Sequence, residues 1–196
     1  NEFFFRKKNT DVPDYVELYN MGNSDIDLEG WTLNDEEIEE GTIEAGGYFL
    51  CAVDDPFFDE DGDEFYTGED WDNSAMVDLS IGYSDDIILL DADGNEVDVV
   101  NYDDDDGWPT SSSDKGHAAE LIDPASDNND PSNWASASEE DVSPWLHNED
   151  SDENDFGSPL EVNTVYSGGS EETSGCTDGN ACNYDPDATV DDGSCL

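Results

Sequence analysis

The residues best suited to chemistry lie near the C-terminal end of the chain, where oxygen-bearing side chains recur at alternate positions. Asn183, Asp185 and Asp187 are followed by Asp191, which places oxygen atoms at relative positions one, three, five and nine. Calcium-binding loops use this spacing because it wraps oxygen ligands around one ion. Ca²⁺ takes about six to eight oxygens, so further carboxylates and backbone carbonyls are expected to complete the shell. The predicted calcium ligands are Asp178, Asn183, Asp185, Asp187, Asp191 and Asp192.

This calcium site lacks one usual ligand and has two competing interpretations. Ser194 stands at position twelve, where calcium loops usually have a bidentate Glu, so we expect modest affinity. One alternative is that the Asp and Asn residues only form turns in a solvated acidic tail. The other is a zinc site, which is disfavoured because oxygen ligands dominate and no Cys-x-x-Cys pair occurs. Calcium is the cofactor that we predict.

Cysteines bracket this motif, and the chain has 4 in all. Cys176 and Cys195 flank the oxygen ligands and are the preferred disulfide pair, closing a loop worth on the order of 3 kcal/mol. A unit of about 20 residues with so few apolar side chains cannot fold on a core, so a disulfide and a metal ion must hold it together. Cys182 then pairs with Cys51 or with another chain, or Cys51 is a buried free thiol on an apolar strand.

The charge of the chain requires external cations. Asp and Glu number 55 against 4 Lys and Arg, which gives a formal net charge of -51. Each close pair of like charges costs about 1 kcal/mol even in water, so these costs accumulate on a crowded surface. Bound calcium in an extracellular medium and concentrated salt around a halophile's protein are the two settings that supply the cations. A nucleic-acid partner is excluded, because such binding needs clustered Lys and Arg.

The one basic cluster is Arg6-Lys7-Lys8. It is interpreted as the solvated end of a strand, with docking of a second copy as the alternative. His117 and His147 are the only histidines, and neither lies in a nucleophile elbow or a His-Glu-x-x-His motif. Paired carboxylates are uninformative in so acidic a chain. We therefore expect no enzymatic activity and a structural role for His117.

Short strands separated by turns are predicted over residues 1–103. Val16 and Leu18 alternate with Glu17 and Tyr19, which is the period of a half-buried strand with its polar side toward solvent. Further strands are predicted at 26–28, 31–33 and 48–53, the last being apolar enough to be covered on both faces. Asp93-Gly94 between two apolar runs predicts a hairpin with a type I′ turn. This pattern indicates an all-β sandwich.

Three acidic stretches, 54–73, 103–116 and 123–157, are too polar for the core and too long for tight turns. The first also carries Phe57, Phe58, Phe65, Tyr66 and Trp71, so we expect it to pack on the sandwich or on a neighbour. Residues 164–175 are rich in Ser, Gly and Glu, which is typical of a linker. The predicted organisation is a sandwich at 1–163, a flexible linker at 164–175 and the cysteine-bracketed motif at 176–196.

No apolar run reaches the roughly 18 residues needed to span a bilayer. The chain opens on an apolar strand at Asn1, without a basic and apolar signal sequence. We expect a soluble product from which an export signal has been removed.

Several dispersed segments together resemble the lamin-tail domain, an immunoglobulin-like β-sandwich found in many secreted bacterial and archaeal proteins. The resemblance spans about residues 1–163 and implies this fold and an extracellular context, without catalytic residues. The tail resembles a short cysteine repeat of secreted bacterial surface proteins and is similar to the calcium-binding type 3 repeats of thrombospondin. The segments that resemble the lamin-tail domain are 1–3, 14–20, 28–33, 45–50, 87–95, 116–124 and 129–134.

The expected fold is thus an all-β, immunoglobulin-like β-sandwich with long acidic loops and a small C-terminal motif stabilised by a disulfide and calcium. The expected function is that of an extracellular structural protein at the cell surface, a calcium-stabilised subunit of a filament or adhesive appendage that self-associates. Phe3-Phe4-Phe5 is the predicted contact or donor segment. The alternatives are a calcium-dependent module that binds carbohydrate or protein through the aromatic stretch at 54–73, and an accessory domain of a secreted hydrolase.

Overall fold

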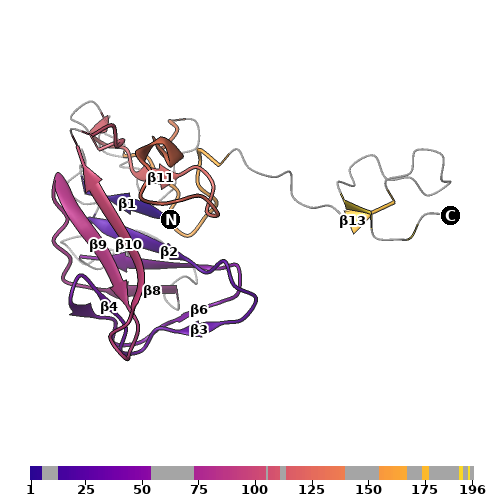
Figure 1. Ribbon diagram of the computed structural model, residues 1–196, viewed down its shortest axis with the longest axis horizontal. Coiled ribbons are helices and arrows are strands. Elements are labelled where there is room, and N and C mark those ends of the chain that lie inside the picture. The colour runs from indigo at the N-terminus through magenta and orange to yellow at the C-terminus, as the bar shows by residue number, and fades with distance from the viewer. Residues whose placement is uncertain are drawn as a thin grey trace, which may run out of the picture. The chain divides into compact units, whose positions relative to one another are not determined.

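The computed structural model describes residues 1–5, 13–53, 73–104, 106–110, 114–139, 155–166, 174–176, 190–191 and 194. It divides into two compact units, Asn1–Tyr166 and Ser167–Leu196. The first unit contains two main sheets, and the second contains the short strands β13 (Ser174–Gly175) and β14 (Val190–Asp191) (Figure 1). Within the described residues, no helix is long and apolar enough to cross a membrane.

The larger sheet of the first unit has six strands in the order β12-β11-β1-β2-β7-β8. Neighbouring strands run antiparallel, except that β7 and β8 are parallel. The strand bounds are β1 (Glu2–Phe4), β2 (Tyr15–Tyr19), β7 (Tyr48–Ala52), β8 (Ser74–Met76), β11 (Ala119–Leu121) and β12 (Trp134–Ser136), the last preceded by the 3-10 helix η3 (Pro131–Asn133).

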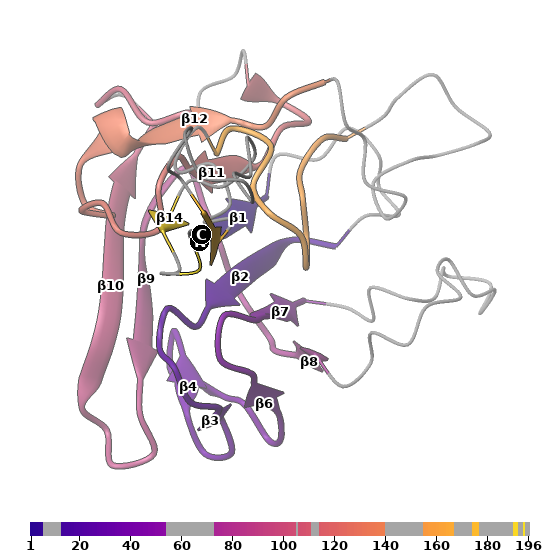
Figure 2. The same cartoon turned by 90° about the vertical axis from the view of Figure 1, so that its right-hand side faces the viewer.

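The smaller sheet has four strands in the order β10-β9-β4-β5, and β3 and β6 form a separate antiparallel pair. Figure 2 shows the long β9–β10 hairpin standing beside the larger sheet. The bounds are β3 (Ile26–Asp27), β4 (Thr32–Leu33), β5 (Glu36–Glu37), β6 (Thr42–Ile43), β9 (Ser84–Leu90) and β10 (Glu96–Asp103). The predicted all-β sandwich is confirmed.

The core between the two sheets is built by side chains at alternate positions of the strands. Phe3, Val16 and Phe49 of the larger sheet pack in one cluster with Leu89 and Val100 of the smaller one. The intervening side chains point to the opposite face, where Phe4, Tyr15 and Leu50 form a second buried cluster. The larger sheet is therefore covered on both faces, as predicted for the strand at 48–53.

The N-terminal apolar strand is part of this core, and the prediction that it is a contact segment is wrong for this structure. β1 lies between β11 and β2, so neither of its edges is open. Phe3 and Phe4 are each 1% exposed. Phe3 packs against Tyr102 and Trp134, with ring centroids 4.7 and 5.3 Å apart.

The predicted β9–β10 hairpin is confirmed, but its type I′ turn is not. Gly94 has a φ of 78°, whereas Asp93 is not among the residues with positive φ. The Asp91 carboxylate accepts hydrogen bonds from the backbone N–H groups of Asp93 and Asn95, at 2.9 and 2.8 Å, and so stabilises a longer loop. Positive φ at both central positions occurs instead at Asn34 and Asp35, between β4 and β5.

Two of the three acidic stretches contribute to the core, contrary to the prediction. Trp108 and Trp134 are 5% and 6% exposed and lie 5.6 Å apart. The stretch at 123–157 also contains β12. Single aromatic rings enter the core while the surrounding carboxylates stay at the surface. The average polarity of these segments therefore does not predict which of their residues are buried. Within the first stretch, residues 54–72, with their aromatic side chains, lie outside the described residues.

Candidate functional site

The most unusual polar group in the structure is a row of three buried glutamates on the outer face of the larger sheet. Glu2 on β1 pairs in register with Glu17 on β2 and with Glu120 on β11, so the three side chains lie side by side. Their exposed fractions are 1%, 0% and 0%. We call these residues the glutamate row. The prediction that Glu17 lies on a solvent-facing side of its strand is wrong.

A segment from far along the chain covers the glutamate row. We call residues 155–166 the strap. Backbone hydrogen bonds hold its beginning to the sheet, from Ala118 N to Phe156 O and from Phe156 N to Gly116 O, both 2.8 Å. Phe156 and Leu160 then pack on the second apolar cluster. The strap is the structure that removes the three glutamates from solvent.

Glu2 and Glu120 are joined through one residue of the strap, Ser158. The Ser158 hydroxyl lies 2.9 Å from Glu2 Oε2 and 3.0 Å from Glu120 Oε1. The Ser158 backbone N–H also points at both Glu2 oxygens, at 3.2 Å, and the Tyr15 hydroxyl donates to Glu2 Oε1. Glu2 thus faces donors from its own sheet and from the strap.

The other oxygens of the row also bind the strap. Glu120 Oε2 accepts hydrogen bonds from Thr164 Oγ1 at 2.7 Å and from Val165 N at 3.0 Å. Glu17 Oε2 accepts from Leu160 N. Its other oxygen, Oε1, accepts from the side-chain amide of Asn1 at 2.7 Å. All three glutamates therefore hold the strap through hydrogen bonds, which keeps these buried polar groups satisfied.

The backbone of the strap is adapted to this close approach. A Cβ atom on Gly157 would lie 2.5 Å from the Tyr15 hydroxyl oxygen and 2.6 Å from Glu2 Oε1, so a side chain does not fit there. Leu160 has a φ of 63°, which is unusual for a residue other than glycine. That conformation accompanies the hydrogen bond from its N–H to Glu17, so local strain is offset by a buried contact.

Burial and mutual repulsion favour the protonated forms of the row. The pKa of Glu2 is raised well above its ordinary value, first by burial and then by the charges of Glu17 and Glu120. Burial likewise raises the pKa of Glu17 to about 8 and raises the pKa of Glu120. Burial and the neighbouring Glu2 also raise the pKa of the Tyr15 hydroxyl. The row can therefore retain protons at a pH at which exposed glutamates are ionised.

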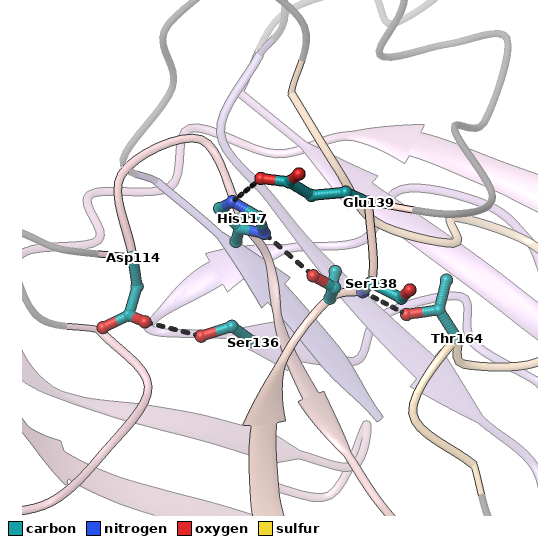
Figure 3. A network of polar contacts seen from close by, with 7 residues as sticks. Asp114, His117, Ser136, Ser138, Glu139 and Thr164 are labelled. Carbon is teal, nitrogen blue, oxygen red and sulfur yellow. Dashed lines mark hydrogen bonds and ion pairs between the residues drawn. The ribbon is translucent and has the colours of Figure 1, made fainter.

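His117 lies at the edge of the same region and serves the fold. Its Nδ1 lies 2.8 Å from the backbone oxygen of Ala137, and its ring lies 4.8 Å from that of Phe156. Its Nε2 lies 3.6 Å from Glu139 Oε1 (Figure 3). These contacts join the end of β12 to the start of the strap. Figure 3 also shows the Ser138 N–H donating to Thr164 Oγ1, at 2.7 Å, which links β12 to the Glu120 partner Thr164.

The predicted calcium ligands belong to the second unit, and the structure describes only part of it. Asp191 lies on β14, whose backbone pairs in parallel with β13 so that Asp191 is in register with Gly175. The other five predicted ligands, Asp178, Asn183, Asp185, Asp187 and Asp192, lie outside the described residues. Among the residues that are described, no group of three His, Cys, Asp or Glu side chains is placed to hold a metal ion. The calcium site stays a prediction.

The structure describes Cys51 and Cys176. Cys176 is buried and disulfide-bonded, and its predicted partner Cys195 lies outside the described residues, as does Cys182. Cys51 is a buried free thiol on β7, and burial raises its pKa to about 12. The alternative in which Cys51 pairs with Cys182 is therefore wrong, because the thiol of Cys51 is enclosed in the sandwich core.

Sequence reasoning missed the glutamate row altogether. The only signal was the presence of Glu2, Glu17 and Glu120 within otherwise apolar strands, and that pattern is equally typical of a strand with one face in water. The strap that distinguishes these two cases lies 156 positions from Glu2 along the chain, at Ser158. No sequence pattern near Glu2 or near Ser158 predicts that these two residues form hydrogen bonds.

Two facing sheets, a largely antiparallel strand order and an apolar layer between them define the first unit as an immunoglobulin-like β-sandwich. The model of one family, the Lamin Tail Domain, matches residues 1–104, which is more than half of the chain. The chain therefore belongs to the lamin tail domain family. No curated protein and no solved structure matches it. β11, β12 and the strap lie beyond the matched residues, so the glutamate row joins the matched part to the segment that follows it.

Proposed function

We propose that the chain is a non-enzymatic, extracellular structural module whose carboxylates are screened by calcium, and that it works as a subunit of a surface assembly such as a filament or adhesive appendage. The observation that carries this proposal is the formal net charge of -51, since 4 basic residues can neutralise only a small share of the 55 Asp and Glu residues. The disulfide at Cys176 supports an extracellular setting, because disulfides persist in oxidising compartments.

The surface of the sandwich supports the need for cations. An open groove of about 500 Å³ is lined by Asp25, Asp27, Glu29, Glu40 and Glu44, and none of the described residues in its lining is Lys or Arg. Carboxylates gathered in a concave surface concentrate counter-cations from the medium. We therefore expect diffuse screening over the sandwich and one specific calcium ion in the tail.

The edges of the sheets limit where copies can associate. The outer edge of β10 is occupied by Asn129, which accepts a hydrogen bond from Asn101 N at 2.9 Å and donates to Val99 O at 2.8 Å. This side chain takes the place of a neighbouring strand and blocks edge pairing there. The edge strand β8 carries Met76, which is 66% exposed, and it is the edge that we propose for contacts between copies.

The test is the mass of the full chain by size-exclusion chromatography with light scattering. We expect higher-order species in millimolar calcium and a smaller species after chelation. The double substitution Asp185→Asn with Asp187→Asn should weaken the calcium response, whereas Asp93→Asn, an exposed change in the β9–β10 loop, should leave it intact. A monomer both with calcium and after chelation would rule out the assembly.

A binding module is the second proposal, and a cavity in the sandwich favours it. The cavity has a volume of about 290 Å³ and is lined by Trp31, Leu18, Leu28, Ile43 and Leu89 together with polar residues at its rim. A carbohydrate or protein ligand retained here should be lost in Trp31→Ala. A ligand bound by the aromatic stretch at 54–73 should instead be lost on replacing Trp71 and Phe58. Unchanged retention in both variants would reject the binding module.

The accessory-domain alternative makes a different prediction. If the chain is one domain of a secreted hydrolase, the full gene continues past Leu196 into a catalytic domain. Sequencing the gene beyond this point separates this alternative from the other two.

A further inference from the structure

The hydrogen bonds at Ser158 cannot all be made by ionised glutamates. The Ser158 hydroxyl carries one hydrogen, yet its oxygen lies within hydrogen-bond distance of two carboxyl oxygens, 2.9 Å from Glu2 Oε2 and 3.0 Å from Glu120 Oε1. An ionised carboxylate only accepts hydrogen bonds. For both contacts to be full hydrogen bonds, one of them must be donated by a carboxyl group that carries a proton.

The remaining contacts indicate which oxygen carries that proton. Glu2 already faces three donors, namely the Tyr15 hydroxyl, the Ser158 N–H and the Ser158 hydroxyl. Glu120 Oε2 accepts from Thr164 and Val165. Glu120 Oε1 has the Ser158 hydroxyl as its side-chain partner, so a proton there completes a chain of donors from Glu120 through Ser158 to Glu2.

We infer that Glu120, Ser158 and Glu2 form a proton-dependent latch that fastens the strap over the larger sheet. With the proton on Glu120 Oε1, every contact of the Ser158 hydroxyl is a hydrogen bond. When the proton leaves to solvent, two carboxylates face one hydroxyl hydrogen, and one buried oxygen at the latch loses its donor. Loss of the proton thus weakens the hold on the strap, which is the segment that leads from the sandwich to the second unit.

Other titratable groups surround the latch and influence the pH at which Glu120 loses its proton. Ionised Glu17 adds repulsion from β2, and among the described residues no Lys or Arg forms an ion pair with the row to offset it. The α-amino group of Asn1 acts in the opposite sense on Glu17. The groups that interact with the row are Tyr15 and Glu17 of β2, Tyr48 of β7 and the α-amino group of Asn1. Asp155 and Tyr166 lie on the strap, and His117 and Glu139 form an ion pair beside β12.

The direct test is a pH titration of the side-chain carboxyl carbons in the full ¹³C-labelled chain. We expect the Glu2 and Glu120 signals to change together, at a pH above the ordinary glutamate value of about 4.3. The signal of the exposed Glu96 serves as the reference. Glu2 and Glu120 both titrating below about pH 5 in the folded chain would overturn the latch. This measurement uses the unmodified protein and does not depend on how any variant folds.

A matched variant tests the consequence for the strap. Glu120→Gln places an amide donor where the latch requires the proton and keeps an acceptor for Thr164 and Val165. Hydrogen-exchange protection factors of residues 158–165 should fall at least tenfold between pH 6 and pH 9 in the unmodified chain and less than threefold in Glu120→Gln. An equal fall in both chains would contradict the latch. Glu96→Gln is the control and should behave as the unmodified chain does.

Discussion

Carboxylates are accommodated differently in two regions of this molecule. On the outer face of the larger sheet, Glu2, Glu17 and Glu120 are excluded from water and are satisfied by hydrogen-bond donors from the strap. In the tail, Asp185 and its neighbours stand in a sequence without an apolar core, where a cation is the expected partner. The comparison teaches that the net charge alone does not say how the carboxylates of an acidic chain are accommodated. Burial favours neutralisation of a carboxylate by a proton, whereas exposure favours neutralisation by a metal ion.

The largest expected effect is that of pH on the sandwich. The raised pKa values mean that the folded chain binds more protons at the glutamate row than the unfolded chain does. Stability is therefore full below the ordinary pKa and is lost as the pH rises through the folded pKa, which is about 8 for Glu17. Each retained proton corresponds to about 1.4 kcal/mol per pH unit, so Glu17 alone should account for a loss of about 4 kcal/mol between pH 5 and pH 8.

Urea unfolding across this pH range measures the effect. Glu17→Gln should flatten the pH dependence, because it removes one of the groups that bind a proton on folding. A free energy of unfolding that rises from pH 5 to pH 8 would show that the row is ionised in the folded state.

The next largest effect is expected from removing a glutamate of the row. Glu17→Ala removes the acceptor of two partly buried hydrogen bonds, from the Leu160 N–H and from one N–H of the Asn1 side-chain amide, whose other acceptor is Asn163 Oδ1. We expect a loss of about 3 kcal/mol in the free energy of unfolding at pH 6. The control is Glu29→Ala, an exposed glutamate, which should change stability by less than about 0.5 kcal/mol. Equal losses in both variants would remove the distinction between buried and exposed carboxylates.

Displacing the strap without changing a charge should have a smaller effect. Gly157→Ala places a methyl group against Tyr15 and Glu2, and we expect it to cost about 2 kcal/mol. Gly82→Ala is the matched control, because a Cβ atom there meets nothing closer than 3.8 Å. Thermal unfolding of the two variants decides whether the close approach at Gly157 is as tight as the structure indicates.

Calcium removal should have the smallest effect on the sandwich and should act on the tail. We expect chelation in dilute salt to raise the rate of proteolysis near Asp185 at least tenfold, because metal and disulfide are the only proposed supports of this unit. A shift of the sandwich transition equivalent to less than about 1 kcal/mol is expected from lost screening. Protease resistance near Asp185 that is unchanged by chelation would reject the calcium site.

Much of the fold was predictable because its signals are local. Alternation located β2 at Tyr15–Tyr19, a continuous apolar run located β7, and Asp93-Gly94 located the β9–β10 hairpin. The family resemblance supplied the sandwich, and the family match at residues 1–104 supports it.

The missed features depend on contacts between distant segments. Glu17 has the spacing of a solvent-facing residue, and only the strap, more than 140 positions later, makes it buried. Trp134 lies in an acidic stretch, yet its ring enters the core because β12 adds to the edge of the larger sheet. Alternation reports which side chains share a face, but it does not report what covers that face.

The most direct test of the two kinds of carboxylate is hydrogen exchange of the full chain under two separate changes, from pH 6 to pH 9 at constant calcium and from calcium to chelator at constant pH. The account predicts that protection of the strap falls with rising pH and is nearly unchanged by chelation, whereas protection of residues 176–196 responds to chelation. A strap that loses protection on chelation as strongly as at high pH, or a tail indifferent to calcium, would contradict it.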